Sequence, residues 1–251
     1  MGTINDFFIP ENTVNYVSED AYSQALPIIR TIEAMARLNN NSIYIIDFYK
    51  KNFLFVSGNP LFLCGFKPEE VKNMGYSFYF NQIPEKEIQL LIKINKAGFD
   101  FYSKIPIVQR LQLSISYDFD IINHGKNILI NHKLTPILLA DNGNIWLACC
   151  QVSLSSNQQP GNIEAQMEGN PNYWSYSMKT CEWAQLPNIL LTDREKEALH
   201  LSIQNYDENG IADKMCVDKQ TVKFHKQSLF AKFNVKSIAA AIAVAIHRKV
   251  I

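Results

Sequence analysis

The sequence predicts an α+β domain followed by a small all-α domain. Residues 42–154 contain two strand-like runs, then several helical segments, then three more strand-like runs. The last sixty or so residues instead contain four short helical segments. The chain has 24 basic and 24 acidic residues, yet its positive charge gathers in this last part. At 251 residues the chain has room for two modest domains.

The amino-acid composition limits the classes of protein to which this chain can belong. Hydrophobic residues make up 47% of the chain, which excludes wholesale disorder. There is no apolar run of about twenty residues, so we expect no membrane partner. The first residues lack the basic and apolar regions of a secretory signal. The cysteines are odd in number and irregularly spaced without a CxxC pair, so we expect a cytoplasmic protein without a metal site: Cys64, Cys149, Cys150, Cys181 and Cys216.

Residues 1–41 are predicted to form an N-terminal helical extension. From Ser18 to Leu38, apolar residues recur at helical spacing: Ala25, Ile28, Ile29, Ile32, Met35 and Ala36. Such a leading helix either covers the sheet of its own domain or pairs with a second copy of the chain.

Period-two alternation and turn residues define the elements of the next domain. We expect strands at 42–47, 53–57, 113–122, 127–139 and 144–153. Helices are expected at 60–63, 68–73 and 84–102. Glycine-containing turns at Gly125 and Gly143 join the last three strands as hairpins.

Several short segments of this domain follow a known pattern. They are Ile46-Asp47, Phe55-Val56-Ser57 with Asn59, Phe62 through Gly65-Phe66, Pro68-Glu69-Glu70-Val71, Met74-Gly75 and Asp141-Asn142-Gly143-Asn144-Ile145-Trp146. This set resembles a PAS domain over residues 42–154. The resemblance implies an antiparallel five-stranded sheet with helices over one face. It also implies a sensing or dimerising role, sometimes with a bound ligand.

We expect no cofactor, although an unidentified small ligand in the PAS-like domain stays open. A flavin photosensor of this family needs a cysteine in an Asn-Cys-Arg motif, and Cys64 does not lie in one. His124 and His132 are the right type for haem ligands but are expected to be ordinary surface histidines. The chain lacks phosphate-binding, nucleophile-elbow and metalloprotease motifs, so no catalytic residues are assigned and no enzyme is expected.

Residues 155–190 are predicted to be a linker because they begin with a polar stretch rich in Gln, Asn, Gly and Pro. Within it, Tyr173 to Met178 alternates aromatic with small or polar residues, which indicates a strand. An aromatic tether is costly to leave in water, so we expect it to dock on a surface that the sequence does not identify.

Residues 191–251 contain N-cap residues at three expected helix starts. Thr192 with Glu195 forms a capping box, while Asp207 and Asp218 can cap a second and a third helix. Only Cys216-Val217 separates these two helices, as in a helix-turn-helix.

The third helix, from Asp218 to about Phe233, has two different faces. Val222, His225, Leu229 and Phe233 share one stripe, which should face a core. The opposite face carries Lys219, Gln220, Lys223, Phe224 and Gln227. Lysine binds phosphates or guanine edges, Gln can read adenine, and a Phe ring can touch a thymine methyl. Lysines around this face are expected to anchor phosphates: Lys214, Lys226, Lys232 and Lys236.

The last helix is apolar all round from Ala239 to Ala245, so it should be buried on more than one side. One side can close the domain core. The other is expected to form a dimer interface through Ala239, Ile242, Ala243 and Ile246.

The motifs of the last sixty or so residues resemble the LuxR/GerE-type helix-turn-helix domain of bacterial transcriptional regulators. They are the run from Leu191 to Glu197 (LTDREKE), Ile211-Ala212, Thr221-Val222-Lys223 with His225, and Lys232, Phe233 and Val235. The resemblance implies that Lys223, Phe224 and Gln227 read bases and that Thr221 contacts a phosphate. The chain departs from the pattern at Asn205, where Gly is usual, at Gly210, where Glu is usual, and at Ile238, near a usual arginine.

Together these features predict a cytoplasmic, dimeric transcriptional regulator that binds double-stranded DNA under control of a PAS-like sensor. The signal is expected to be a small molecule or a protein. Two alternatives stay open: a PAS-based redox or ligand sensor with a cofactor, and a protein-interaction scaffold that does not bind DNA.

Overall fold

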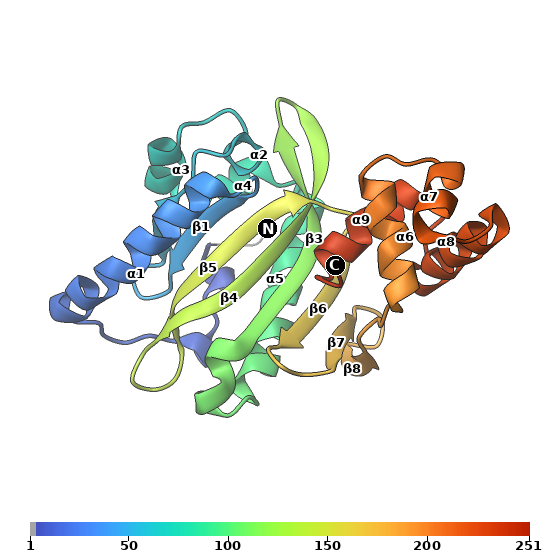
Figure 1. Ribbon diagram of the computed structural model, residues 1–251. Coiled ribbons are helices and arrows are strands. Elements are labelled where there is room, and N and C mark those ends of the chain that lie inside the picture. The colour runs from blue at the N-terminus through green and yellow to red at the C-terminus, as the bar shows by residue number, and fades with distance from the viewer. Residues whose placement is uncertain (1–3) are drawn as a thin grey trace. The chain divides into compact units, whose positions relative to one another are not determined.

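The computed structural model describes residues 4–251 (Figure 1). It divides the chain into an N-terminal unit, residues 1–186, and a C-terminal unit, residues 187–251. Among the described residues no single helix is long and apolar enough to cross a membrane. One pair of helices, Lys219–Phe233 and Ile238–His247, bent by 53°, passes that test together by length and composition only.

The described part of the N-terminal unit is built on one sheet. The strands are β1 Ser42–Asp47, β2 Asn52–Val56, β3 Leu113–Asn123, β4 Lys126–Leu139, β5 Ile145–Leu154, β6 Gly161–Met167, β7 Asn172–Ser177 and β8 Glu182–Pro187. Their order is β2-β1-β5-β4-β3-β6-β7-β8. The expected five strands are present, and their pairings are antiparallel. The expectation of a five-stranded sheet is nevertheless wrong, because three more strands extend it beyond β3.

The additional strands come from the segment predicted to be a linker. Strand β6 pairs antiparallel with β3, and β7 pairs with β6. Ile163 and Ala165 of β6 are fully buried while their neighbours are polar. This alternation of apolar and polar residues was a strand signal within a stretch whose overall composition is that of a loop. Burial of its apolar side therefore decided the structure of this segment.

Helices cover one face of the sheet with the main core. They are α2 Pro60–Leu63, α3 Pro68–Met74, α4 Ser77–Gln82 and α5 Glu85–Ser103, with the 3-10 helices η1 Ile4–Phe7, η2 Pro10–Asn12 and η3 Ile107–Gln112. Helix α5 crosses behind β3 and β4 in Figure 1. Fully buried aromatic side chains fill this core, among them Tyr44, Phe53 and Phe62.

The leading helix α1, Glu19–Leu38, lies on the other face of the sheet, in front of β1 and β5 in Figure 1. The Ser18 hydroxyl accepts a hydrogen bond from the Ala21 N–H (3.1 Å) and caps its start. Ala25 and Ile29 are buried against Ile45 and Leu147 of the sheet. The helix therefore covers the sheet of its own domain.

The aromatic tether docks on α5. The ring of Phe101 lies 5.4 Å from Trp174 of β7 and 4.7 Å from Trp183 of β8, and Tyr176 lies 5.1 Å from Trp183. These four rings, which we call the aromatic clasp, fix the end of the N-terminal unit to its longest core helix. The surface that receives the tether was not evident from the sequence, because the docking residue lies more than seventy positions earlier.

Replacing Trp183 with Ala should lower the free energy of unfolding of the N-terminal unit by about 1–2 kcal/mol. The substitution removes the buried area of the half-buried Trp183 ring and its tilted ring contacts with Phe101 and Tyr176. Urea denaturation followed by the fluorescence of Trp146 and Trp174 measures the change. Lys179→Ala, at the exposed turn between β7 and β8, is the control; an equal effect of the two variants would contradict a role for the clasp.

The C-terminal unit consists of four helices: α6 Asp193–Ile203, α7 Glu208–Met215, α8 Lys219–Phe233 and α9 Ile238–His247. Two apolar clusters hold it together. One joins Ala198 to Ile211, Met215 and Val222, and the other joins Leu199 to Leu229, Ala241 and Ala245. Helices α6, α7 and α8 thus surround the first cluster, and α9 closes the second.

Candidate nucleic-acid interface

The three predicted caps of α6, α7 and α8 are present. Thr192 and Glu195 form the capping box of α6. The Asp207 carboxylate accepts from the Gly210 N–H (2.8 Å), and the Asp218 carboxylate accepts from the Thr221 N–H (2.7 Å). Each cap satisfies an N–H that would otherwise lack a partner at a helix start, so the sequence fixes where α7 and α8 begin.

The turn between α7 and α8 is tight because Cys216 takes the left-handed conformation (φ 53°). The Val217 N–H donates to the Ala212 carbonyl (3.0 Å) and closes α7. Asn205, where the family has Gly, also has a positive φ of 65°. Asn tolerates this conformation, which explains why the departure at this position leaves the turn intact.

Helix α8 exposes the residues predicted to face outward. Its buried stripe is Val222, Leu229 and Phe233, with His225 partly exposed at its edge. The opposite side, which we call the recognition face, is exposed to solvent at every position: Lys219, Gln220, Lys223, Phe224 and Gln227. Phe224 is 66% exposed. The Phe224 ring is therefore not part of the core, and it is accessible from solvent together with the lysines and amides of this face.

Other predicted contact residues lie around the recognition face with different accessibility. Lys236 is exposed, whereas Thr221 and Lys226 are half-buried. Lys219 approaches Glu208 of α7 at 4.0 Å, a weak exposed pair that leaves the ammonium accessible.

Lys232 differs from the other lysines because its ammonium is used inside the C-terminal unit. It donates to the Glu195 carboxylate (2.7 Å) and to the Leu190 carbonyl (2.9 Å). Its role as a phosphate anchor stays a prediction, and in this geometry a phosphate would compete with the buried Glu195 carboxylate for the ammonium. The sequence pattern did not reveal this pairing across 37 positions.

Glu195 is 3% exposed and is held by three residues, the N-cap of its own helix and two side chains of α8. It accepts from the Thr192 N–H and from the Ser228 hydroxyl, both at 2.7 Å, in addition to Lys232. Burial favours its neutral form, but the hydrogen bonds from Lys232, Ser228 and Thr192 outweigh this and lower the pKa of Glu195 to about 2. The carboxylate therefore ties α6 to α8 and fixes the orientation of the recognition face.

Helix α9 has an exposed apolar stripe. Ala239, Ala243 and Ile246 are exposed, and Ile242 is half-buried against the core. These are the residues predicted to meet a second copy, while Ala241 and Ala245 on the other side are fully buried.

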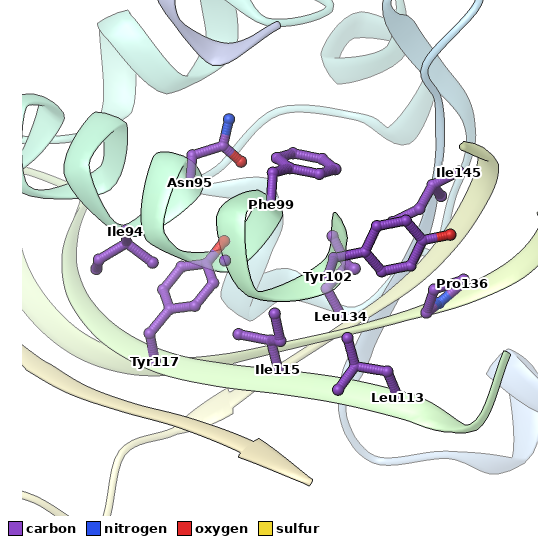
Figure 2. A pocket seen from close by; sticks show the side chains of 11 residues that line it. Ile94, Asn95, Phe99, Tyr102, Leu113, Ile115, Tyr117, Leu134, Pro136 and Ile145 are labelled. Atoms are coloured by element: carbon purple, nitrogen blue, oxygen red, sulfur yellow. The ribbon is translucent and has the colours of Figure 1, made fainter. Parts of the chain in front are cut away.

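A separate cavity lies inside the N-terminal unit, between α5 and the sheet. Figure 2 shows Phe99 and Tyr102 of α5 opposite Ile115, Tyr117 and other side chains of β3 and β4. The cavity has a volume of about 40 Å³. Since roughly 10–15 Å³ holds one water molecule, this space is that of a few waters and is lined mainly by apolar side chains.

Next to this cavity lies a buried polar cluster that contains His132. Its Nε2 lies 2.5 Å from the Tyr44 hydroxyl, which also bonds to the Tyr79 hydroxyl, and its ring lies 4.8 Å from that of Tyr117. Its Nδ1 has no hydrogen-bond partner among the described residues. Burial lowers the pKa of His132 to about 3, so the ring is neutral. The expectation of a surface position is therefore wrong for His132, whereas His124 is exposed on its turn.

Comparison with known proteins gives a match for the C-terminal unit. Residues 190–245 match the family of bacterial regulatory proteins described as the luxR family. No curated protein matches the chain.

Solved structures similar to the chain include VqmA proteins. A phage VqmA–DPO complex is 13% identical, with 90% of each chain covered and a TM-score of 0.32. The Vibrio cholerae VqmA dimer without target DNA is 15% identical, with 88% of this chain and 87% of that chain covered and a TM-score of 0.31. A Vibrio VqmA–ligand–DNA complex is 14% identical, with 88% of this chain and 87% of that chain covered and a TM-score of 0.31. These similarities assign no residue a role. The family match, together with the caps and the tight turn, identifies residues 190–245 as a LuxR-type helix-turn-helix domain.

Proposed function

We propose that the protein is a DNA-binding transcriptional regulator that inserts α8 into the major groove. The observation that carries this proposal is the recognition face, on which lysine ammonium groups, glutamine amides and an exposed Phe ring stand together. Lys223, Phe224 and Gln227 lie on adjacent turns of one helix and are proposed to contact base edges. Thr221, Lys219, Gln220, Lys226 and Lys236 flank them and are proposed to contact the phosphate backbone.

Charge supports this assignment. From Val217 to the end of the chain the only acidic residue is Asp218, and its carboxylate caps α8. The hydrogen bond from the Thr221 N–H lowers the pKa of Asp218, so the cap keeps its charge. The remaining charged residues of this stretch are basic. Neutralising phosphates releases counterions, so binding should weaken steeply with salt.

The protein is proposed to act as a homodimer on paired half-sites, with the exposed α9 stripe as one contact between copies. The N-terminal unit is proposed to be a PAS-like sensor domain whose state controls DNA binding. The cavity between α5 and β3 favours a sensor role. Helix α5 lines this cavity and also carries Phe101 of the aromatic clasp. A ligand that widens the cavity would thus act on the helix that holds the last strands before the C-terminal unit.

Replacing Lys223 with Ala should weaken binding to the preferred duplex by about 1–3 kcal/mol, or roughly 5- to 150-fold, if the side chain reads a base. The duplex is first obtained by selection from random DNA, and affinities are then titrated at several salt concentrations. Lys236→Ala should instead weaken all duplexes alike and reduce the slope of log affinity against log salt by about 1.

Lys126→Ala, at the start of β4, is the matched control because it removes the same charge at an exposed position of the N-terminal unit. An affinity unchanged by Lys223→Ala and insensitive to salt would favour the alternative of an interaction scaffold. A visible absorption band of the purified protein would favour the alternative of a sensor that carries a cofactor.

A further inference from the structure

A buried carboxylate lies on the face of the sheet away from the main core, close to the connection from β5 to β6. Asp118 of β3 is 0% exposed. Its strand neighbours Tyr117 and Phe119 pack into the main core, so the Asp118 side chain points to the opposite face. An ionised carboxylate that has lost its water is costly unless other groups replace its hydration.

The partners of this carboxylate are neutral groups. The Asn131 Nδ2 of β4 donates to its Oδ1 (2.8 Å). The Nδ2 atoms of Asn157 and Asn162 donate to its Oδ2 (2.6 and 2.8 Å). The Ser155 hydroxyl donates to it as well. Among the described residues these donors include no basic side chain, so they solvate the negative charge of Asp118 without neutralising it.

One buried oxygen beside the carboxylate has no donor. Asn131 is 2% exposed, and its Oδ1 is buried without a hydrogen-bond partner among the described residues. A half-turn about the Cβ–Cγ bond exchanges the oxygen and nitrogen of a carboxamide, so this oxygen can take the place of Nδ2 next to Asp118. Because it has already lost its water and gained no donor, it can bind a cation without a further desolvation cost.

Two main-chain carbonyl oxygens lie at the same place. The Asn131 Nδ2 is 3.4 Å from the Tyr117 carbonyl oxygen, and the Asn162 Nδ2 is 2.7 Å from the Gln159 carbonyl oxygen. Each of these amide nitrogens therefore bridges a carboxylate oxygen and a carbonyl oxygen. With the amides turned, carboxylate, carboxamide and carbonyl oxygens surround one position without nitrogen or sulfur. Hard cations prefer such a set of ligands.

The charge of these ligands selects a monovalent ion. Asp118 supplies one negative charge, and the asparagines and main-chain carbonyls supply none. One Na⁺ or K⁺ therefore makes the buried set neutral, whereas Ca²⁺ leaves an excess positive charge away from water. Mg²⁺ usually keeps several of its own waters, for which a buried position next to Asp118 is unsuited.

The ligands reach from the protein interior to its surface. Asp118 and Asn131 are buried, whereas Asn157 and Asn162 are exposed. The two exposed amides form the outer wall of this position and can turn without disturbing the core. An ion can therefore enter from solvent while the strands stay paired.

We propose that Asp118, Asn131, Asn157 and Asn162 bind one alkali-metal cation, Na⁺ or K⁺. The ion ties the connection between β5 and β6 to β3 and β4. This connection precedes the three strands that lead along the chain to the C-terminal unit. The stability of the N-terminal unit therefore depends on the concentration of the alkali cation, independently of DNA binding.

Urea denaturation of the full chain, followed by tryptophan fluorescence, tests this site. NaCl or KCl replaces tetramethylammonium chloride at constant ionic strength, so that only the size of the cation changes. The unfolding equilibrium constant of the wild type should fall about tenfold when the alkali ion reaches about ten times its dissociation constant. Asp118→Asn removes the charge and should abolish this dependence. The wild type, but not this variant, should also broaden the sodium NMR signal.

Asn157→Ala and Asn127→Ala are a matched pair, because both change an exposed asparagine of the N-terminal unit and keep the buried carboxylate. Asn157→Ala removes one ligand and should raise the dissociation constant of the ion by about fivefold or more, since one oxygen contact is lost. Asn127→Ala, four residues before Asn131 on β4, should keep the wild-type value.

An equal ion dependence in the wild type, Asp118→Asn and Asn157→Ala would overturn the proposal. So would equal stability of the wild type in alkali and tetramethylammonium chlorides. Stabilisation by CaCl₂ but by neither NaCl nor KCl would overturn the assignment to a monovalent ion. These measurements contain no DNA, so a negative result for Lys223→Ala leaves them unaffected.

Discussion

Replacing Lys232 with Met should lower the free energy of unfolding of the C-terminal unit by about 2–3 kcal/mol. The substitution leaves the Glu195 carboxylate, 3% exposed, without its counter-ion. Breaking a buried pair in this way costs about 3–5 kcal/mol, and the value here is reduced because the Lys232 side chain is 33% exposed. Urea denaturation followed by far-UV circular dichroism measures the loss.

The double variant Glu195→Gln with Lys232→Met separates the ion pair from general packing. It should recover part of the stability, because a neutral amide replaces the unpaired carboxylate. All three tryptophans lie before residue 187, so the fluorescence transition reports the N-terminal unit and should not move. A double variant as unstable as the sum of the two single variants would show that Glu195 and Lys232 do not act as a pair.

The same pair gives the C-terminal unit a defined acid sensitivity. The pKa of Glu195 is lowered from 4.5 to about 2 in the folded state, so its contribution is present above pH 4.5. It is lost progressively as the pH falls from about 4.5 to about 2, because only the unfolded chain takes up the proton over that range.

Acidification from pH 6.5 to pH 5 should destabilise the N-terminal unit by about 2 kcal/mol through His132 alone. The folded state holds this ring neutral down to a pKa of about 3, whereas the unfolded chain protonates it near 6.5. Each pH unit between these values therefore costs about 1.4 kcal/mol, because the unfolded state binds one more proton. The effect is absent above pH 6.5 and grows as the pH falls.

The variant His132→Gln should remove this pH dependence, measured as the difference in unfolding free energy between pH 7 and pH 5 by tryptophan fluorescence. Burial also raises the pKa of Asp118 and of Glu87, which acts in the opposite direction. Asp118 and Glu87 are present in both the wild type and the His132→Gln variant, so their contributions to the pH dependence cancel when the two are compared. His124→Gln, at an exposed position of the same unit, is the control and should keep the wild-type slope; a wild-type slope in His132→Gln would contradict the assignment.

Local signals predicted the C-terminal unit well. The caps at Thr192, Asp207 and Asp218 act within three residues of themselves, and each starts a helix where expected. The two faces of α8 follow from its period, so Val222 is buried and Phe224 is exposed as expected. Short-range hydrogen bonds and helical periodicity do not depend on the rest of the fold, and for this reason the sequence alone carried them.

The failures concern partners distant in sequence. Composition described residues 155–190 as a linker, but β6 pairs with β3 and buries Ile163. A position on a strand near a turn suggested a surface site for His132, but the helices packed over that face bury it. Lys232 looked like one more basic residue, but Glu195 lies beside it across the helix packing.

The sequence by itself determined where the helices begin, which side of α8 faces out and that positive charge gathers at one end of the chain, since these depend on neighbours a few residues apart. Only the tertiary structure decided that the sheet continues to β8, that Phe101 receives the aromatic tether and that α1 covers the sheet of its own unit. Burial and pairing between segments far apart depend on how the whole unit packs, and no local pattern records them.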